Sequence, residues 1–140
     1  MMKNTTLAIT VFLSVLTVSI LTQCVKPLAP VSKANSMGIV IYSDDIETVW
    51  NALRFANYSK NQGDSVSIFL LGKGVELENL VKSDSTIKEQ SDKFTGSGGI
   101  ILGCGTCLSS RNNNTPQVCK FSSMKDLYEM IHNNKIVMTF

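Results

Sequence analysis

The sequence predicts an α/β domain in three layers, α/β/α, around a mostly parallel sheet of about five strands. Residues 38–42 and 66–71 are short, continuous apolar runs, which are typical of strands that a parallel sheet buries on both faces. Between them, apolar side chains recur at the i, i+3, i+4 and i+7 spacing of an amphipathic helix. Such a strand, helix and strand form a crossover unit, and these units build parallel sheets with helices on both faces.

An N-terminal leader precedes this domain. Lys3 is followed by a stretch, residues 7–21, that is almost wholly apolar or Thr/Ser, and this pattern is typical of a secretory signal. The stretch falls short of the ~20 apolar residues of a comfortable membrane span, but an uncleaved anchor stays open as an alternative. We expect residues 1–24 to be a signal peptide or a lipoprotein leader, so that the folded part works outside the cytoplasm, in the periplasm or at the cell surface.

Cys24 is the candidate for lipid attachment. The sequence Leu21-Thr22-Gln23-Cys24 resembles a bacterial lipobox, in which a small residue precedes a cysteine that becomes lipid-modified. Gln23 departs from that pattern, and cleavage after Ala34 is the alternative. We expect a lipid on Cys24, or an uncleaved anchor, to hold the domain to a membrane.

The boundaries of the next elements are marked by prolines, capping residues and glycines. Residues 25–36 contain two prolines and no periodic apolar pattern, so we expect a flexible tether there and the domain itself at residues 37–140. The first helix follows three residues that can cap it, Ser43, Asp44 and Asp45. Gly63 is expected to end this helix in the left-handed conformation.

The second half of the domain carries weaker signals. Residues 75–81 predict a short helix, residues 82–95 a weak helix anchored by two apolar side chains, and residues 100–102 a third strand. Ser123 and Asp126 resemble a capping box. The helix behind them has an apolar stripe, and residues 136–140 predict a last strand. The stripe consists of Met124, Leu127, Tyr128 and Ile131.

The charge balance argues against one class of partner. Lys3, Lys26 and Lys33 precede the domain, so 10 of the 13 basic residues remain in it beside all 11 acidic residues, a net charge of −1. The basic balance of the whole chain therefore comes from the leader and the tether, and nothing predicts a surface for nucleic acid. No motif calls for a cofactor.

Two cysteines lie three positions apart where the third strand ends. Cys104 comes directly after that strand, and reactive groups in open α/β sheets gather just beyond the carboxyl ends of the strands. Gly103 and Gly105 flank it, which would allow a tight turn and the close approach of a substrate. Cys107 is expected near the start of the following helix, where exposed N–H groups and the helix dipole favour a thiolate.

Several kinds of chemistry fit this spacing. A thioredoxin-like disulfide also uses two cysteines before a helix, but usually earlier in its domain. Zinc needs four ligands, and Cys104, Cys107, Cys119 and His132 would have to supply them at spacings that match no compact zinc module. Buried structural cysteines fit Cys119 better than the pair. If Cys24 is lipidated, three cysteines remain, and an odd number in an exported protein indicates a reactive thiol.

The chain resembles the DsrE/DsrF-like sulfur-relay family from residue 38 to residue 140. Three segments carry the resemblance: Gly-Lys-Gly-Val at 72–75, Cys-Gly-Thr-Cys-Leu at 104–108 with Arg111 after it, and Ser-Met-Lys-Asp-Leu at 123–127. The resemblance implies a DsrE-like α/β fold and a homo-oligomer, commonly a trimer or a hexamer. It also implies a relay in which a cysteine takes sulfane sulfur from a donor, holds it as a persulfide and passes it to a partner.

The resemblance assigns a role to each candidate residue. Cys104 is the first candidate for the sulfur carrier, Cys107 the second and Cys119 the third, while Arg111, four residues after Cys107, would stabilise a thiolate or persulfide by its charge. Asn112 stands where the family usually has glycine, and asparagine tolerates the left-handed conformation better than most residues. Two other functions stay open: a thiol-disulfide redox protein that uses Cys104 and Cys107, and a binding module that keeps the fold without the relay.

Overall fold

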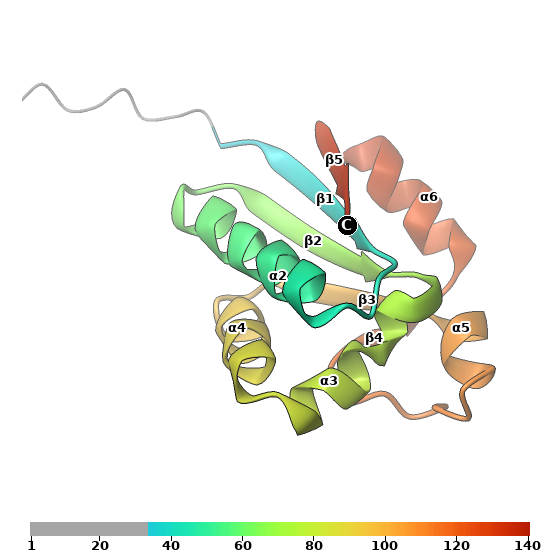
Figure 1. The fold of residues 1–140 in the computed structure, drawn as a ribbon. Coiled ribbons are helices and arrows are strands. Elements are labelled where there is room, and N and C mark those ends of the chain that lie inside the picture. Colours follow the sequence, from blue (N-terminus) through green and yellow to red (C-terminus); the bar gives the residue numbers. More distant parts are fainter. Residues whose placement is uncertain (1–33) are drawn as a thin grey trace, which may run out of the picture. The chain divides into compact units, whose positions relative to one another are not determined.

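The computed structural model describes residues 34–140 as one α/β unit (Figure 1). The leader, Cys24 and most of the predicted tether lie outside the described residues. No helix in the described part of the chain is long and apolar enough to cross a membrane. The elements in chain order are β1 (Ser36–Ile41), α2 (Ile46–Asn61), β2 (Ser65–Leu70), the 3₁₀ turn η1 (Gly72–Glu76), α3 (Leu77–Ser83), α4 (Ser85–Gly96), β3 (Ile100–Cys104), α5 (Gly105–Ser109), β4 (Lys120–Ser122), α6 (Met124–Asn133) and β5 (Ile136–Thr139).

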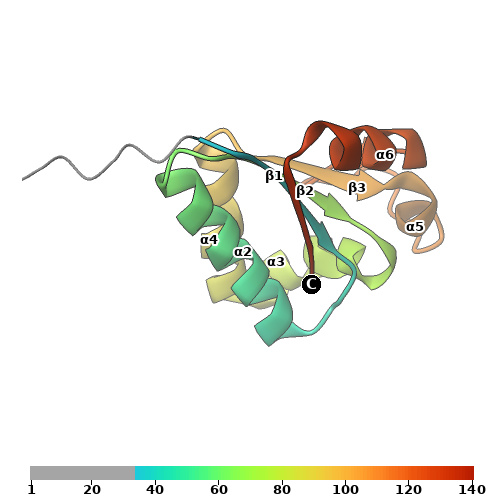
Figure 2. The same ribbon diagram turned by 90° about the horizontal axis from the view of Figure 1, so that it is seen from above.

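The five strands form one parallel sheet in the order β4-β3-β2-β1-β5. Figure 2 shows α2 and α4 on one face of this sheet and α6 on the other. The short helix α5 follows the end of β3 and contacts η1 and β4. The predicted α/β class, the parallel sheet and the helices on both faces are therefore confirmed.

The core lies where α2 packs on β1 and β2 and α4 packs on β3. Ile39 and Ile41 of β1 and Ile68 and Leu70 of β2 are fully buried, which explains why their strands are continuous apolar runs. Val49, Leu53 and Ala56 of α2 pack against them as the predicted stripe requires. Burial of apolar surface contributes about 25 cal/mol per Å² and is the main favourable contribution to folding.

The ends of α2 follow the predicted signals. The Asp45 carboxylate accepts a hydrogen bond from the Thr48 N–H at 2.8 Å, as an N-cap does, and this bond lowers the pKa of Asp45. Gly63 has a φ of 93° and donates its N–H to the Lys60 carbonyl, which is the helix end expected of a left-handed residue.

Three local predictions need correction. The helix predicted as weak at residues 82–95 is the regular helix α4, because Asp84 caps it and Ile87, Ser91 and Phe94 are buried one turn apart. Strand β4 was not predicted, because it has only three residues and none of them is buried. The tether also ends earlier than residue 36: the Asn35 N–H bonds the Asp64 carboxylate, and Ser36 already belongs to β1.

The predicted stripe of α6 does not face the core. The capping box of Ser123 and Asp126 is present, but Met130 is the buried residue of this helix and Leu127 is half-buried. Met124, Tyr128 and Ile131, which share one face at the i, i+4, i+7 spacing, are exposed. One side of α6 is therefore an apolar surface that the single chain leaves open to water.

Candidate functional site

The two neighbouring cysteines lie at the carboxyl edge of the sheet, next to η1. Leu70 at the end of β2 pairs with Gly103 near the end of β3, so the turn after β2 and the helix after β3 begin side by side. Cys104 is both the last residue of β3 and the N-cap of α5, and Cys107 is the third residue of α5. The predicted placement of both cysteines is confirmed.

Cys107 is the more accessible of the two thiols. Its side chain is half-buried, and its sulfur accepts a hydrogen bond from the Gly72 N–H at 3.3 Å. An N–H aimed at a sulfur stabilises negative charge that develops there. The residue that supplies this donor belongs to the Gly-Lys-Gly turn, which the sequence singled out only as a motif.

Cys104 is buried, with only 3% of its surface exposed. Burial raises the pKa of the Cys104 thiol, and its hydrogen bond with the Cys107 side chain raises that pKa further. The expectation that Gly103 and Gly105 open a way to Cys104 is wrong for the single chain. A Cβ at Gly103 would collide with the Cys119 sulfur, and one at Gly105 with the Phe121 ring, so these glycines make room for neighbouring side chains.

Arg111 was predicted to act on a cysteine sulfur, but it contacts the backbone of Cys107 instead. Its Nε donates to Glu76 Oε1 at 2.7 Å, and its Nη1 donates to the backbone carbonyl of Cys107 at 3.0 Å. The guanidinium is thus paired with a carboxylate and bonded to the backbone of Cys107, and neither bond involves the sulfur. The turn that brings it there depends on Asn112, which adopts the expected left-handed conformation with φ 57°.

Cys119, the third candidate, is held by a buried carboxylate. Glu78 is 2% exposed and accepts three backbone hydrogen bonds, from Gln117, Val118 and Cys119, at 2.8–3.0 Å. Burial first, and then Glu78 through a hydrogen bond and its charge, raises the pKa of Cys119 to about 12. A thiol that keeps its proton is a poor nucleophile, so this environment favours a structural role for Cys119 over the role of a sulfur carrier.

All three cysteines in the described part of the chain are free thiols. No group of three His, Cys, Asp or Glu side chains among residues 34–140 could hold a metal ion. His132, the fourth zinc ligand that was considered, lies on α6, where its ring stacks on Tyr128 and its Nδ1 bonds the Tyr128 carbonyl oxygen.

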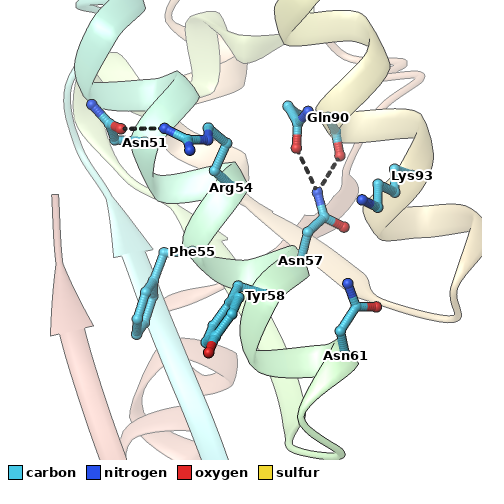
Figure 3. A pocket seen from close by; sticks show the side chains of 8 residues that line it. All are labelled: Asn51, Arg54, Phe55, Asn57, Tyr58, Asn61, Gln90 and Lys93. Atoms are coloured by element: carbon cyan, nitrogen blue, oxygen red, sulfur yellow. Dashed lines mark hydrogen bonds between the residues drawn. The ribbon is translucent and has the colours of Figure 1, made fainter.

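A separate cavity of about 450 Å³ lies between α2 and α4 (Figure 3). Arg54 and Lys93 line it, and Asn57 donates its amide to the backbone and side-chain oxygens of Gln90. The cavity has no thiol and no carboxylate among its lining residues.

Sequence reasoning missed three residues of the candidate site: Gly72 as an N–H donor, Glu76 and Glu78. Their partners are far away in the sequence: the fold places η1 against β3 and α5, and it places Glu78 of α3 against the backbone of residues 117–119. No spacing along the chain connects Glu76 to Arg111 or Glu78 to Cys119.

Comparisons with known proteins bear on the fold alone. No family model matches the chain, and no curated protein matches it. Among solved structures, the chain is similar to a conserved protein of unknown function from Bacteroides thetaiotaomicron, with a TM-score of 0.63 and 23% sequence identity over 76% of this chain and 95% of that one. This similarity supports the α/β architecture.

Proposed function

We propose that the protein is a sulfur carrier, or sulfurtransferase-like protein, that holds sulfane sulfur as a persulfide on the Cys104–Cys107 pair and passes it to a partner. One observation carries the proposal: Cys107 is an accessible thiol at the carboxyl edge of a parallel sheet, with the Gly72 N–H donating to its sulfur and the Cys104 thiol beside it. Two of the three segments that carry the resemblance to the DsrE/DsrF-like family, residues 72–75 and residues 104–108 with Arg111, form this site.

The burial of Cys104 leads us to exchange the roles first expected for the two thiols. The Cys107 thiolate attacks the outer sulfur of a persulfide or polysulfide donor, RS–SH, forms Cys107–S–SH and releases RS⁻. An acceptor nucleophile then removes the outer sulfur and restores the thiolate. Alternatively, Cys104 gives up its proton and its thiolate attacks the inner sulfur of Cys107–S–SH, which forms a Cys104–Cys107 disulfide and releases the outer sulfur as HS⁻, which takes up a proton to become H₂S.

The second candidate function is thiol-disulfide exchange. The contact between the Cys104 and Cys107 side chains favours it, because neighbouring thiols form a disulfide when an oxidant takes two electrons and two protons from them. The predicted leader strengthens this alternative, since compartments outside the cytoplasm are oxidising. In either function, Cys24 would hold the domain to a membrane through its lipid.

Mass spectrometry of the reduced protein after exposure to polysulfide separates the two functions. We expect Cys104→Ser to gain one sulfur atom on Cys107 and to keep it, because no neighbouring thiol can resolve the persulfide. We expect this uptake to be faster than that of free cysteine, because the Gly72 N–H stabilises negative charge on the Cys107 sulfur. We expect Cys107→Ser to gain none, and the matched control Cys119→Ser to behave as the wild type, because Cys119 keeps its proton.

One result would count against sulfur carriage, and another against Cys107 as the thiol that takes up the sulfur. If the wild type loses two hydrogens in the presence of a disulfide while Cys104→Ser takes up no sulfur, the protein is a redox exchanger. If Cys107→Ser takes up sulfur as fast as the wild type, the entry thiol has been assigned wrongly.

We also propose that the open face of α6 is buried in a homo-oligomer. Met124, Tyr128 and Ile131 are all exposed, Tyr128 to 62%, and Ile136 and Val137 of the edge strand β5 add further apolar surface. A soluble single chain rarely leaves several large apolar side chains together on one element. The resemblance to an oligomeric family makes a second copy of this chain the expected occupant.

Light scattering with size-exclusion chromatography tests the assembly. We expect the wild type to elute as an oligomer and Tyr128→Lys to elute as a smaller species with an unchanged circular dichroism spectrum, because the new charge would lie in the interface. The control Tyr58→Lys changes a tyrosine that is equally exposed on α2 and should leave the mass unaltered. A monomeric wild type would refute the proposal.

A further inference from the structure

We infer that Glu76 and Arg111 form a positioning pair that holds Cys107 against the Gly72 N–H. This inference rests on the proposed function in one respect, namely that Cys107 is the thiol that reacts. The pair itself follows from contacts that η1 makes with the helix α5 and with the turn behind it.

Both ends of η1 fix the position of Cys107, one directly and the other through Arg111. Gly72, its first residue, donates its N–H to the Cys107 sulfur at 3.3 Å. Glu76, its last residue, binds the guanidinium of Arg111 at 2.7 Å, and Arg111 in turn donates to the Cys107 carbonyl oxygen at 3.0 Å. The side chain and the backbone of Cys107 are thus tied to one five-residue turn.

The geometry of the pair requires an arginine. Two different nitrogens of one planar guanidinium reach two acceptors, Glu76 Oε1 and the Cys107 carbonyl oxygen, and the planar group fixes the angle between these two bonds. A lysine at position 111 would bring one ammonium group to the same space. The exposed fractions of the Arg111 and Glu76 side chains are 33% and 28%, so water screens this pair less than the surface pair Lys73–Asp44, with 68% and 43%.

The site needs such a tie because α5 is weak by itself. It has five residues, and helices that short do not persist on their own propensity. Without the tie, α5 can shift away from η1, and the Cys107 sulfur then loses the Gly72 N–H. Because Glu76 already balances its charge, Arg111 acts through geometry and not by lending positive charge to the sulfur.

Four variants of the full chain test the inference, each made in the Cys104→Ser protein. In Arg111→Met and Glu76→Ala we expect sulfur uptake by Cys107 from polysulfide to slow by about threefold to tenfold, the effect of one lost hydrogen bond. We expect the exchange of the Gly72 amide hydrogen, followed by NMR, to quicken in the same two variants.

Glu76→Gln should retain most of the sulfur uptake and most of the protection of the Gly72 amide, since its amide oxygen can still accept from Arg111 Nε. The double variant Arg111→Met/Glu76→Ala should be no worse than either single change, because the two residues act as one unit.

Lys73→Met is the matched control. It removes a positive charge from the same turn, but Lys73 pairs with Asp44 and not with Cys107 or its helix. Equal slowing in Lys73→Met would show that charge alone matters, and an unchanged Gly72 amide in Arg111→Met would show that the pair does not position Cys107. Either result overturns the inference. If the Cys104→Ser parent takes up no sulfur, the proposed function has failed, while the Gly72 amide still decides whether the pair holds Cys107.

Discussion

Replacing Gly74 by alanine is expected to lower the free energy of unfolding by about 3 kcal/mol or more, a large fraction of the roughly 5–15 kcal/mol that is typical of a domain. The added Cβ would lie far inside contact distance of the Ile41 carbonyl oxygen and close to the Tyr42 backbone. That oxygen also accepts the Leu71 N–H at 2.9 Å. Because the obstacle is the backbone of β1, which lies inside the sheet between β2 and β5, no change of side-chain rotamer relieves it, and η1 must move away from the sheet. Sulfur uptake by Cys107 should also slow, because η1 carries the Gly72 N–H that donates to the Cys107 sulfur.

Urea denaturation followed by circular dichroism measures this loss, and the chain offers a matched control. Gly96, at the end of α4, has no neighbour within 4 Å of an added Cβ. Gly96→Ala should therefore be neutral or slightly stabilising, because alanine is the better helix former. If Gly74→Ala unfolds at the same urea concentration as Gly96→Ala, the close approach of η1 to β1 does not exist in solution.

Much of the fold could be predicted because its signals are local. The strands β1 and β2 are buried on both faces, so their residues are apolar without interruption, and Asp45 and Gly63 are needed at the ends of α2 for reasons that apply to any helix. Helix α4 was underestimated because its exposed face is polar and only Ile87, Ser91 and Phe94 are buried. Strand β4 has no pattern of its own and exists because β3 supplies a partner.

The candidate site could be predicted only in part, for a related reason. The spacing of Cys104 and Cys107 and their position after a strand are properties of the sequence, but their relative exposure is not. Gly103 and Gly105 suggested an open approach, whereas the folded chain fills that space with Cys119 and Phe121. Arg111 was expected to act on sulfur from its spacing along a helix, yet α5 ends at Ser109 and Glu76, from another element, fixes where the guanidinium lies.

Replacing Glu78 by alanine is expected to cost about 2–4 kcal/mol of the free energy of unfolding. The carboxylate is the acceptor for the N–H groups of Gln117, Val118 and Cys119, and a buried donor that loses its partner costs about 1–3 kcal/mol. Gln117 is exposed and Val118 is half-buried, so water can reach their N–H groups, and the costs do not simply add. Urea denaturation measures the loss, and the control Glu89→Ala changes an exposed glutamate on α4 and should cost little.

The isosteric variant Glu78→Gln separates the charge of Glu78 from its shape. In the wild type, the pKa of Cys119 is about 12, against an ordinary value of 9.0 that applies to the unfolded chain. Above pH 9.0 the unfolded state therefore releases the Cys119 proton, while the folded state keeps it. The contribution of the protonated Cys119 thiol to the free energy of unfolding is complete below pH 9.0 and is lost as the pH rises toward 12. Because Glu78 supplies part of the rise in the pKa of Cys119, we expect the free energy of unfolding of Glu78→Gln to fall less above pH 9.0 than that of the wild type. Cys119→Ala should lack the part of this fall that comes from Cys119. We also expect Cys119 to be alkylated at a lower pH in Glu78→Gln than in the wild type. An alkaline loss of the same size in the wild type and in Cys119→Ala would mean that other groups cause it, and that Glu78 does not hold the Cys119 thiol in its protonated form.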